Sequence, residues 1–270
     1  AMLMIVPLVY TTNIYDYTLV PKRLAFFACL ALAAFGWLAQ AIRSRSTISY
    51  GLPTQLLGTY AILVCLSLYK ATNLSVGIVE LIFQLALICL YLLAAQAKPR
   101  DVQIWMWTIL GISAVVSTIG IQEYLGVAFA DIPSNGRPSA TFGFRNFAAM
   151  YLVASLPVCF YQFWLGKGTV STAVSAVSGV LTTLFLLYTR TRGAWLGAAA
   201  GLIGGVVLVV AEKSSREAMF PLLRSPGTFR SAAACVSLLL ILAAGPLSPG
   251  FRDTGLQRFD DKKSDLTTTV

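Results

Sequence analysis

Residues 136–147 read Gly-Arg-Pro-Ser-Ala-Thr-Phe-Gly-Phe-Arg-Asn-Phe, a short polar and cationic segment that separates two long apolar runs. One run precedes the segment at Val102–Val127, and the other follows it at Phe147–Leu165. Each run has roughly the 20 residues that an α-helix needs to cross the hydrocarbon core of a bilayer. The segment therefore reads as a loop between two membrane-spanning helices, with arginines near the membrane surface.

The same alternation continues in both directions along the 270 residues. Hydrophobic residues make up 57% of the chain and charged residues 11%, whereas soluble domains carry about 25% charged residues. Because lipid offers no partner to open backbone groups, we expect an all-α, polytopic helix bundle over residues 1–244. Residues 245–270 are expected to begin a polar loop. The bundle should hold eight to nine spans, the first of them partial, at Met2–Tyr10, Leu24–Ile42, Gln55–Leu68, Val76–Ala97, Val102–Val127, Phe147–Leu165, Val170–Tyr188, Ala194–Ala211 and Ser231–Ala244.

The chain has a formal net charge of +9 and no histidine. Its basic residues are scattered between apolar spans, which argues against a nucleic-acid-binding face and favours contacts with anionic membrane lipids. If the first loop, Thr11–Pro21, lies outside the membrane-enclosed compartment, the loops on the inside carry basic residues such as Arg43, Lys98 and Arg100. The outside loops carry almost as many, so the usual excess of basic residues inside is weak. Outside arginines accompanied by Ser, Thr, Asn and Gly favour a site for an anion.

The five cysteines all lie within apolar stretches, without a Cys-x-x-Cys pair or a Cys/His cluster. Neither a disulfide framework nor a zinc site is predicted, and no cofactor is expected.

The segment at 136–147 has the features of a phosphate site at the start of a helix. Pro138 fixes the backbone after Arg137, and Gly143 permits a tight turn. Asn146 is a candidate cap for a helix that begins at Phe147. Helix N-termini carry partial positive charge and open N–H groups. An ordinary capped loop that anchors to lipid headgroups explains the same residues, and both interpretations stay open.

A second cationic junction reads Tyr188-Thr-Arg-Thr-Arg-Gly-Ala-Trp195. The guanidinium groups of Arg190 and Arg192 can bind phosphate oxygens bidentately, with Thr189 and Thr191 supplying hydroxyls. Two arginines that only reach toward the membrane surface are an equal alternative. The span that follows has glycine every fourth residue, which predicts a close approach to a neighbouring helix; these glycines are Gly193, Gly197, Gly201 and Gly205.

These motifs resemble those of the O-antigen ligase family. Residues 137–149 look like its pattern R-x-S-x-T-F-G-N-x-N-x-x-A, and residues 189–194 look like its T-x-S-R-G-A segment. Val20-Pro-Lys22 resembles the P-K pair that opens its second span. The order of the three motifs and the hydropathy of the whole chain also fit.

The resemblance implies a protein of the bacterial inner membrane with about twelve spans, which acts in lipopolysaccharide biosynthesis or a related pathway. It implies transfer of a glycan from undecaprenyl pyrophosphate to a lipid, glycan or protein acceptor on the periplasmic side, without metal or nucleotide. Besides this donor and acceptor, membrane lipids and further membrane subunits are candidate partners. On this interpretation Arg192 is the catalytic cation, and the donor-binding residues are Arg190, Arg137, Arg145, Asn146, Thr141 and Lys22.

Two departures from the family pattern bear on this interpretation. Phe144 stands where the family commonly has Asn. The family activates the acceptor with a histidine in a large periplasmic loop, and this chain has no histidine. We therefore expect the chain to be part of a longer polypeptide. Residues 245–270 would then be only the beginning of that loop. Glu123 and Asp131 are substitute bases, although ordinary solvated loop carboxylates explain them more simply.

Two other classes of function remain open. A structural subunit of a larger membrane assembly would need no histidine, and its glycine-bearing span would contact partner proteins. A transporter for a lipid-linked anion would need polar groups deep in several spans. Glu80 and Gln84, one turn apart in the fourth span, are the sole pair of this kind in the sequence.

Overall fold

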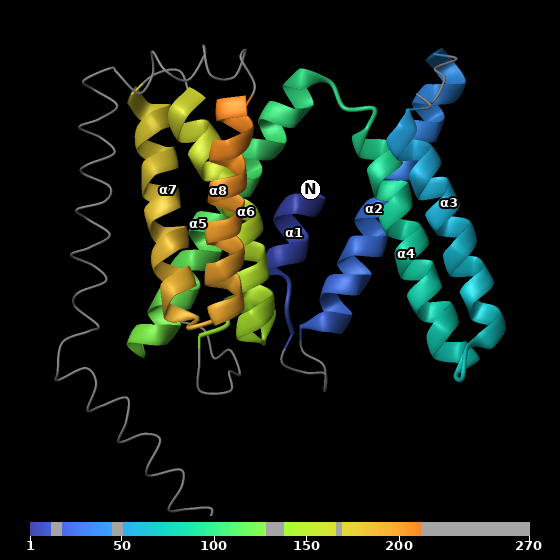
Figure 1. Ribbon diagram of the computed structural model, residues 1–270, viewed down its shortest axis with the longest axis horizontal. Coiled ribbons are helices and arrows are strands. Elements are labelled where there is room, and N and C mark those ends of the chain that lie inside the picture. Colours follow the sequence, from blue (N-terminus) through green and yellow to red (C-terminus); the bar gives the residue numbers. More distant parts are fainter. Residues whose placement is uncertain (12–17, 45–50, 128–137, 166–168, 212–270) are drawn as a thin grey trace, which may run out of the picture. The chain divides into compact units, whose positions relative to one another are not determined.

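The computed structural model describes residues 1–11, 18–44, 51–127, 138–165 and 169–211 of the chain (Figure 1). Within these residues the regular structure is helical, without strands, so the predicted all-α class is confirmed. The elements in chain order are α1 (Met2–Leu8), α2 (Leu19–Ser44), α3 (Leu52–Ser67), η1 (Leu68–Lys70), α4 (Leu74–Ala94), α5 (Pro99–Leu125), η2 (Ala140–Phe142), α6 (Arg145–Leu165), α7 (Thr169–Tyr188) and α8 (Arg192–Ala211).

Six helices in the described ranges are long and apolar enough to cross a membrane: α2, α3 together with η1, α4, α5, α6 and α7. They indicate a multi-pass membrane protein. The expected count of eight to nine spans is not confirmed. The first expected span is the seven-residue helix α1, which contains Pro7 and gives way to extended backbone at Val9. The last expected span, Ser231–Ala244, lies outside the described residues.

Most helix boundaries fall within about three residues of the expected ones. The largest difference is at α2, which begins at Leu19 rather than Leu24. Proline is tolerated in the first turn of a helix, where its missing N–H would have no partner. Pro21 and Lys22 therefore belong to the first turn of this span.

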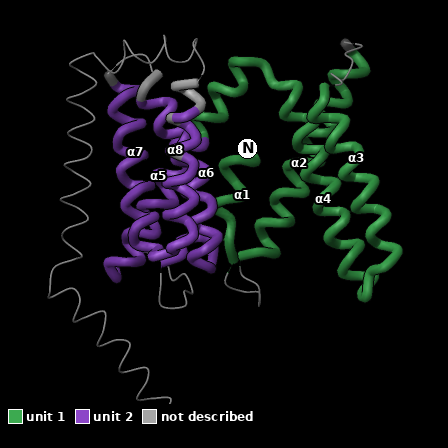
Figure 2. Tube along the Cα trace, in the orientation of Figure 1, with its two compact units in different colours: residues 1–108 green, residues 109–270 purple. Residues whose placement is uncertain are grey.

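The chain divides into two compact units, residues 1–108 and residues 109–270 (Figure 2). The sequence predicted a single bundle over residues 1–244, without this division. The boundary between the units falls inside α5.

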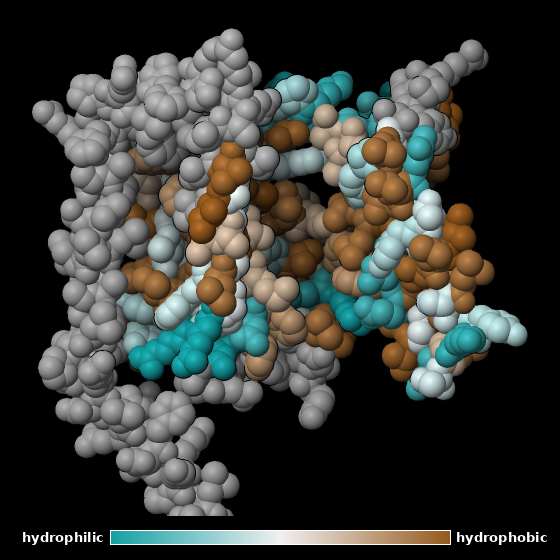
Figure 3. Space-filling model, in the orientation of Figure 1, coloured by the Kyte–Doolittle hydropathy of each residue, from teal (hydrophilic) through white to brown (hydrophobic). Residues whose placement is uncertain are grey.

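Unit 1 is built on α2, which packs against α1 and α4, while α3 packs against α4. Its core holds Phe26, Leu30 and Ala86, with the rings of Phe26 and Phe83 5.6 Å apart. None of the residues of α3 is buried, and apolar side chains cover much of the surface of this unit (Figure 3). An exposed apolar surface is what a helix in lipid requires.

Helices α2 and α4 run parallel. Near their N-terminal ends, Arg23 pairs with Glu80 at 3.8 Å and lies over the ring of Phe83 at 5.2 Å. Near their C-terminal ends, Trp37 and Leu93 line the same groove. Both helices therefore end on the same side of unit 1.

In unit 2, α6 packs against α7 and α8. Polar side chains join α5 to α6 and α7. The buried hydroxyl of Ser178 on α7 donates to the Leu110 carbonyl of α5 at 2.8 Å. It also lies 3.3 Å from the Ser113 hydroxyl and 3.8 Å from the Cys159 sulfur of α6. Interhelical hydrogen bonds of this kind hold helices together where lipid provides no hydrophobic driving force.

The described residues do not show the close helix approach predicted for the glycines of α8, which stays a prediction. A Cβ at Gly193, Gly201 or Gly205 would meet no atom within 4 Å, and one at Gly197 would just reach Val153 of α6. The tight contact lies instead on α5. A Cβ at Gly120 would overlap the ring of Phe185, a fully buried residue of α7.

Candidate anion-binding site

Three polar segments meet at one end of unit 2: the end of α5, the segment around η2 that leads into α6, and the turn between α7 and α8. The rings of Tyr124 on α5 and Tyr188 on α7 are stacked, with centroids 4.1 Å apart. The neighbouring carboxylate of Glu123 accepts hydrogen bonds from the backbone N–H groups of Ser139 at 2.9 Å and Ala140 at 2.8 Å. The last turn of α5 thus connects both motifs that the sequence singled out.

Glu123 holds the chain in an unusual conformation. Ala140 has φ 46° and Gly143 has φ 67°, both in the left-handed region. The prediction that Gly143 permits a tight turn is confirmed. For Ala140 this conformation is strained, and its N–H is fixed by the carboxylate of Glu123.

The expectation that Glu123 is a solvated loop carboxylate is therefore wrong. Its side chain is half-buried, and one of its oxygens accepts two backbone N–H groups. A carboxylate committed to these bonds is a poor base for an acceptor hydroxyl. Asp131, the other substitute base, lies outside the described residues.

We expect Glu123→Gln to loosen the segment from Ser139 to Gly143 without unfolding the helices. A neutral amide makes weaker hydrogen bonds than a carboxylate, and bonds to charged groups contribute about 1.5–3 kcal/mol. Hydrogen exchange at the amides of Ser139 and Ala140 should speed up at least about tenfold, because 1.4 kcal/mol corresponds to a factor of ten. Asp101→Asn, in the first turn of α5, is the matched control and should leave these two amides protected. Unchanged exchange in the Glu123 variant would contradict the role that we assign to the carboxylate.

Helix α6 begins two residues earlier than the sequence predicted, which moves its cap. The carbonyl of Phe144 accepts the N–H groups of Phe147 at 3.1 Å and Ala148 at 3.3 Å, so Phe144 holds the capping position. The prediction that Asn146 caps this helix is wrong, since Asn146 lies in the first turn with an exposed side chain. The Phe144 side chain cannot accept a hydrogen bond, whereas the asparagine that the resembled family commonly has here could.

The turn between α7 and α8 is short and closely bonded. The N–H of Thr189 donates to the carbonyl of Phe185 at 3.0 Å, and the N–H of Arg190 donates to Leu187 at 3.1 Å. The indole N–H of Trp195 reaches back to the carbonyl of Leu186 at 3.2 Å. These bonds fix the backbone from which Arg190 projects.

Thr191 starts the next helix. Its carbonyl accepts the N–H groups of Ala194 at 3.1 Å and Trp195 at 3.2 Å, which places Arg192 at the first residue of α8. Thr189 is fully buried, and its hydroxyl donates to the Leu186 carbonyl at 2.7 Å. Both hydroxyls that were candidate ligand contacts thus serve the turn, since that of Thr191 donates to the Thr189 carbonyl at 3.4 Å.

Three arginines gather at this end of unit 2. The side chains of Arg190 and Arg192 are exposed, and that of Arg145, the first residue of α6, is half-buried. Within the part of the chain that the structure describes, none of the three forms an ion pair with a carboxylate. A hydrophilic patch is visible where α7 joins α8 (Figure 3). Cations that no described carboxylate neutralises, next to the positive ends of α6 and α8, favour the binding of an anion.

Thr141 and Arg137 are two other residues that the sequence predicted for the site. Thr141 lies in η2 with 2% of its surface exposed, so it helps to pack this segment and is not on a surface that a glycan reaches. Arg137 lies outside the described residues.

Lys22 belongs to unit 1, where the structure gives it a structural role. Its ammonium group donates to the carbonyls of Val6 at 3.1 Å, Pro7 at 2.8 Å and Val9 at 2.9 Å. An ammonium group has three N–H donors, and these contacts use all of them to close the C-terminal end of α1. We therefore leave Lys22 out of the proposed anion site.

The polar pair on which the transporter interpretation depended also has partners. Glu80 pairs with Arg23 of α2, and the amide oxygen of Gln84 accepts the hydroxyl of Tyr60 on α3 at 3.2 Å. These contacts join α4 to both neighbouring helices. Packing within unit 1 explains this pair without a transport pathway.

Glu123 was expected from the sequence as a substitute base or a solvated carboxylate, and its bonds to the backbone of Ser139 and Ala140 were not predicted. The available signal was its position, since a carboxylate in the last turn of an apolar span is costly unless it has a partner. No group of three His, Cys, Asp or Glu residues that could hold a metal occurs among the described residues.

Comparisons with known proteins give no match. No protein-family model, curated protein or solved structure is similar to the chain at a significant level. The resemblance of its motifs to the O-antigen ligase family therefore stays a prediction, and function has to be argued from the residues.

Proposed function

We propose that this chain forms the donor site of a membrane glycosyltransferase of the O-antigen ligase type, in the inner membrane of a bacterium. It would transfer a glycan from undecaprenyl pyrophosphate to an acceptor hydroxyl on the periplasmic side. One observation carries the proposal most directly. Arg190 occupies a left-handed backbone position, with φ 49°, at the end of α7.

Glycine is the usual residue at such a position, because any side chain is strained there. An arginine kept at this cost, without an ion pair to a described carboxylate, argues that its guanidinium group has a task. Arg192 follows two residues later at the positive end of α8. Two guanidinium forks so close together suit a group with several anionic oxygens, such as a pyrophosphate.

The chemistry requires charge stabilisation at the leaving group. The acceptor oxygen bonds to the anomeric carbon of the glycan, and the bond from that carbon to the pyrophosphate oxygen breaks. The electron pair of the broken bond stays on the pyrophosphate, whose negative charge therefore rises in the transition state. Fixed cations aimed at that oxygen favour the transition state over the ground state. In the proposal, Arg192 meets this charge, while Arg190 and Arg145 hold the remaining phosphate oxygens.

The proton of the acceptor hydroxyl needs a base. Glu123 is committed to the backbone of Ser139 and Ala140, so we do not assign it this task. The proposal for this chain therefore concerns the donor side of the reaction.

Arg190→Gly separates the structural from the functional explanation of this residue. Glycine adopts the left-handed conformation without strain, so the variant should be as stable as the wild type or more stable, by about 1 kcal/mol. Glycan transfer from an undecaprenyl-pyrophosphate donor should nevertheless fall at least about tenfold, because one phosphate ligand is lost. Thermal unfolding is measured in detergent. Glycan transfer is measured for the wild type and the variant, each reconstituted in proteoliposomes.

Lys70→Gly is the matched control, since Lys70 is exposed in η1 and lies outside the proposed site. It should leave transfer unchanged. A stable Arg190→Gly variant that transfers glycan at the wild-type rate would contradict the proposal.

A second candidate function is a non-catalytic subunit of a membrane assembly. One observation favours it: the face of α8 that carries Gly193, Gly201 and Gly205 is open, with no described atom near these positions. Transfer activity that depends on Arg192 would exclude this candidate. Absence of transfer, together with stable recovery of a second protein bound to α8, would support it.

A further inference from the structure

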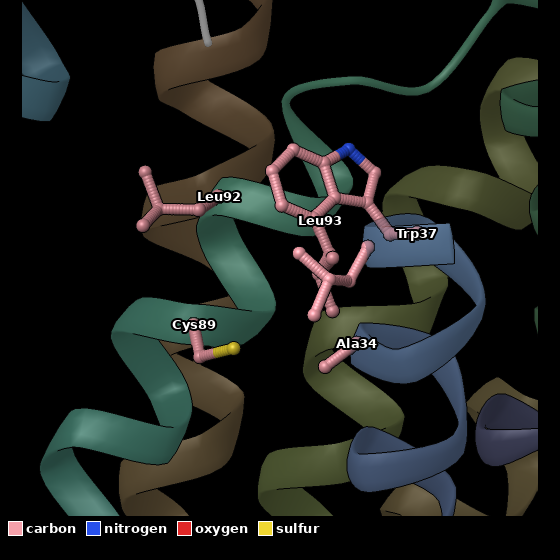
Figure 4. A pocket seen from close by; sticks show the side chains of 6 residues that line it. Ala34, Trp37, Cys89, Leu92 and Leu93 are labelled. Carbon is pink, nitrogen blue, oxygen red and sulfur yellow. The ribbon is translucent and has the colours of Figure 1, made fainter. Parts of the chain in front are cut away.

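Unit 1 carries an apolar groove between α2 and α4, with a volume of about 230 Å³. Figure 4 draws its six lining side chains and labels five of them: Ala34 and Trp37 on α2, and Cys89, Leu92 and Leu93 on α4. Leu38 of α2 completes the lining, and the groove surface is almost wholly apolar. Both helices are long and apolar enough to cross a membrane. A hydrocarbon chain from the surrounding lipid fits such a groove, whereas water finds no hydrogen-bonding partner there.

Basic residues lie beyond the groove, on the side where α2 and α4 both end. Arg43 is in the last turn of α2, six residues beyond Trp37, and this many residues of helix rise about 9 Å. Lys98 and Arg100 follow the end of α4, and all three side chains are exposed. The described carboxylate near them, Asp101, accepts the backbone N–H of Lys98 at 3.0 Å. The local charge therefore remains positive.

This arrangement matches the two ends of one lipid molecule. The apolar groove lies at the depth of an acyl chain, and the cations lie about one to two helical turns further along, where a headgroup phosphate would be. A zwitterionic headgroup also has a phosphate but carries a cation of its own beside it. Each basic residue near a membrane surface therefore adds attraction mainly for a headgroup with net negative charge.

We propose that unit 1 binds one anionic glycerophospholipid of the bilayer, with an acyl chain in the groove and its phosphate at Arg43 and Lys98. This site is separate from the arginines of unit 2 and does not depend on the proposed glycosyltransferase function. It would explain why basic residues stand at the ends of both helices that form the groove. The occupant is a structural lipid of the leaflet that faces the ends of α2 and α4.

The test is native mass spectrometry of the full chain in mixed micelles that contain equal amounts of phosphatidylglycerol and phosphatidylcholine. We expect the wild type to retain one phosphatidylglycerol at least about tenfold in preference to phosphatidylcholine. Ala34→Phe fills the groove and should lose the bound lipid. The double variant Arg43→Gln/Lys98→Gln keeps the groove and should lose the preference for the anionic lipid. Lys70→Gln removes one exposed cation outside this site, as a control, and should behave as the wild type.

Three results would overturn the proposal. One is retention of phosphatidylglycerol by Ala34→Phe at the wild-type level. Another is an unchanged lipid preference in Arg43→Gln/Lys98→Gln. The third is displacement of phosphatidylglycerol by an equal amount of undecaprenyl phosphate, which would make the occupant a polyprenyl lipid instead.

Cys89 provides a second measurement that needs no variant, in case Ala34→Phe does not fold. Its thiol lines the groove, whereas Cys65 on α3 is exposed and lies outside it. Added phosphatidylglycerol should slow the alkylation of Cys89 by a small apolar maleimide at least about threefold more than phosphatidylcholine does. The rate at Cys65 should be the same in both lipids. Equal protection of Cys89 by the two lipids would contradict a headgroup-specific site.

Discussion

Replacing Arg192 by alanine is expected to lower the rate of glycan transfer at least about 100-fold, while the protein still inserts and folds. Removal of one preorganised group that stabilises developing charge costs about 10²–10³ in rate in well-studied enzymes. The side chain is exposed at the first residue of α8 and forms no ion pair with a described carboxylate, so its loss should cost little stability. The measurement is the rate of glycan transfer by the native protein, purified from its membrane and reconstituted with donor and acceptor lipids.

Two further variants make this result interpretable. Arg192→Lys keeps the charge but loses the planar fork, so it should retain part of the rate. Lys70→Ala removes an exposed cation outside the site and should retain all of it. If Arg192→Ala transferred glycan at the wild-type rate, Arg192 would not be the catalytic cation.

Replacing Gly120 by alanine is expected to destabilise unit 2 strongly, although it adds a single methyl group. The new Cβ would overlap the ring of Phe185, which is fully buried. Overpacking of this kind costs about 1–3 kcal/mol even where the surroundings relax. The variant should show a clearly lower midpoint of thermal unfolding in detergent and a lower yield of folded protein.

Gly111→Ala on the same helix is the control. A Cβ there meets no atom within 4 Å, so this variant should be as stable as the wild type or slightly more stable. Adding Phe185→Leu to Gly120→Ala should restore part of the lost stability, because the smaller side chain leaves room for the methyl group. Equal stability of the Gly120 and Gly111 variants would show that α5 and α7 do not approach each other as described.

Much of the fold was predictable because a bilayer imposes a strong pattern on the sequence. Apolar runs of sufficient length gave the positions of α2 to α8, and polar segments gave their ends. The first span was not predictable in this way. Val9 and Tyr10 continue the apolar run, yet α1 stops at Leu8, where Lys22 reaches back to the carbonyls of Val6 and Pro7. A contact between residues so far apart in sequence leaves no local signature.

The arginines of the site could be predicted from the sequence, but the residues that position them could be predicted less well. Arg190 and Arg192 are conspicuous between apolar runs, and Gly143 indicated its turn correctly. Glu123 was underrated because its partners are backbone N–H groups sixteen and seventeen residues away, which any residue type could supply. The glycines of α8 predicted a contact that the described residues do not show. Spacing on α8 suggested a close approach, but the helix that is actually tight against its neighbour has a single glycine at the contact, Gly120.

In the proposed function, the cationic end of unit 2 recognises a pyrophosphate carried by a membrane lipid. This recognition is tested most directly by titrating the protein in lipid nanodiscs with undecaprenyl pyrophosphate and, separately, with undecaprenyl monophosphate. We expect the wild type to bind the pyrophosphate at least about tenfold more tightly, and we expect Arg190→Gly/Arg192→Ala to remove this difference. Equal affinity of the wild type for the two lipids, or an unchanged preference in the double variant, would contradict it.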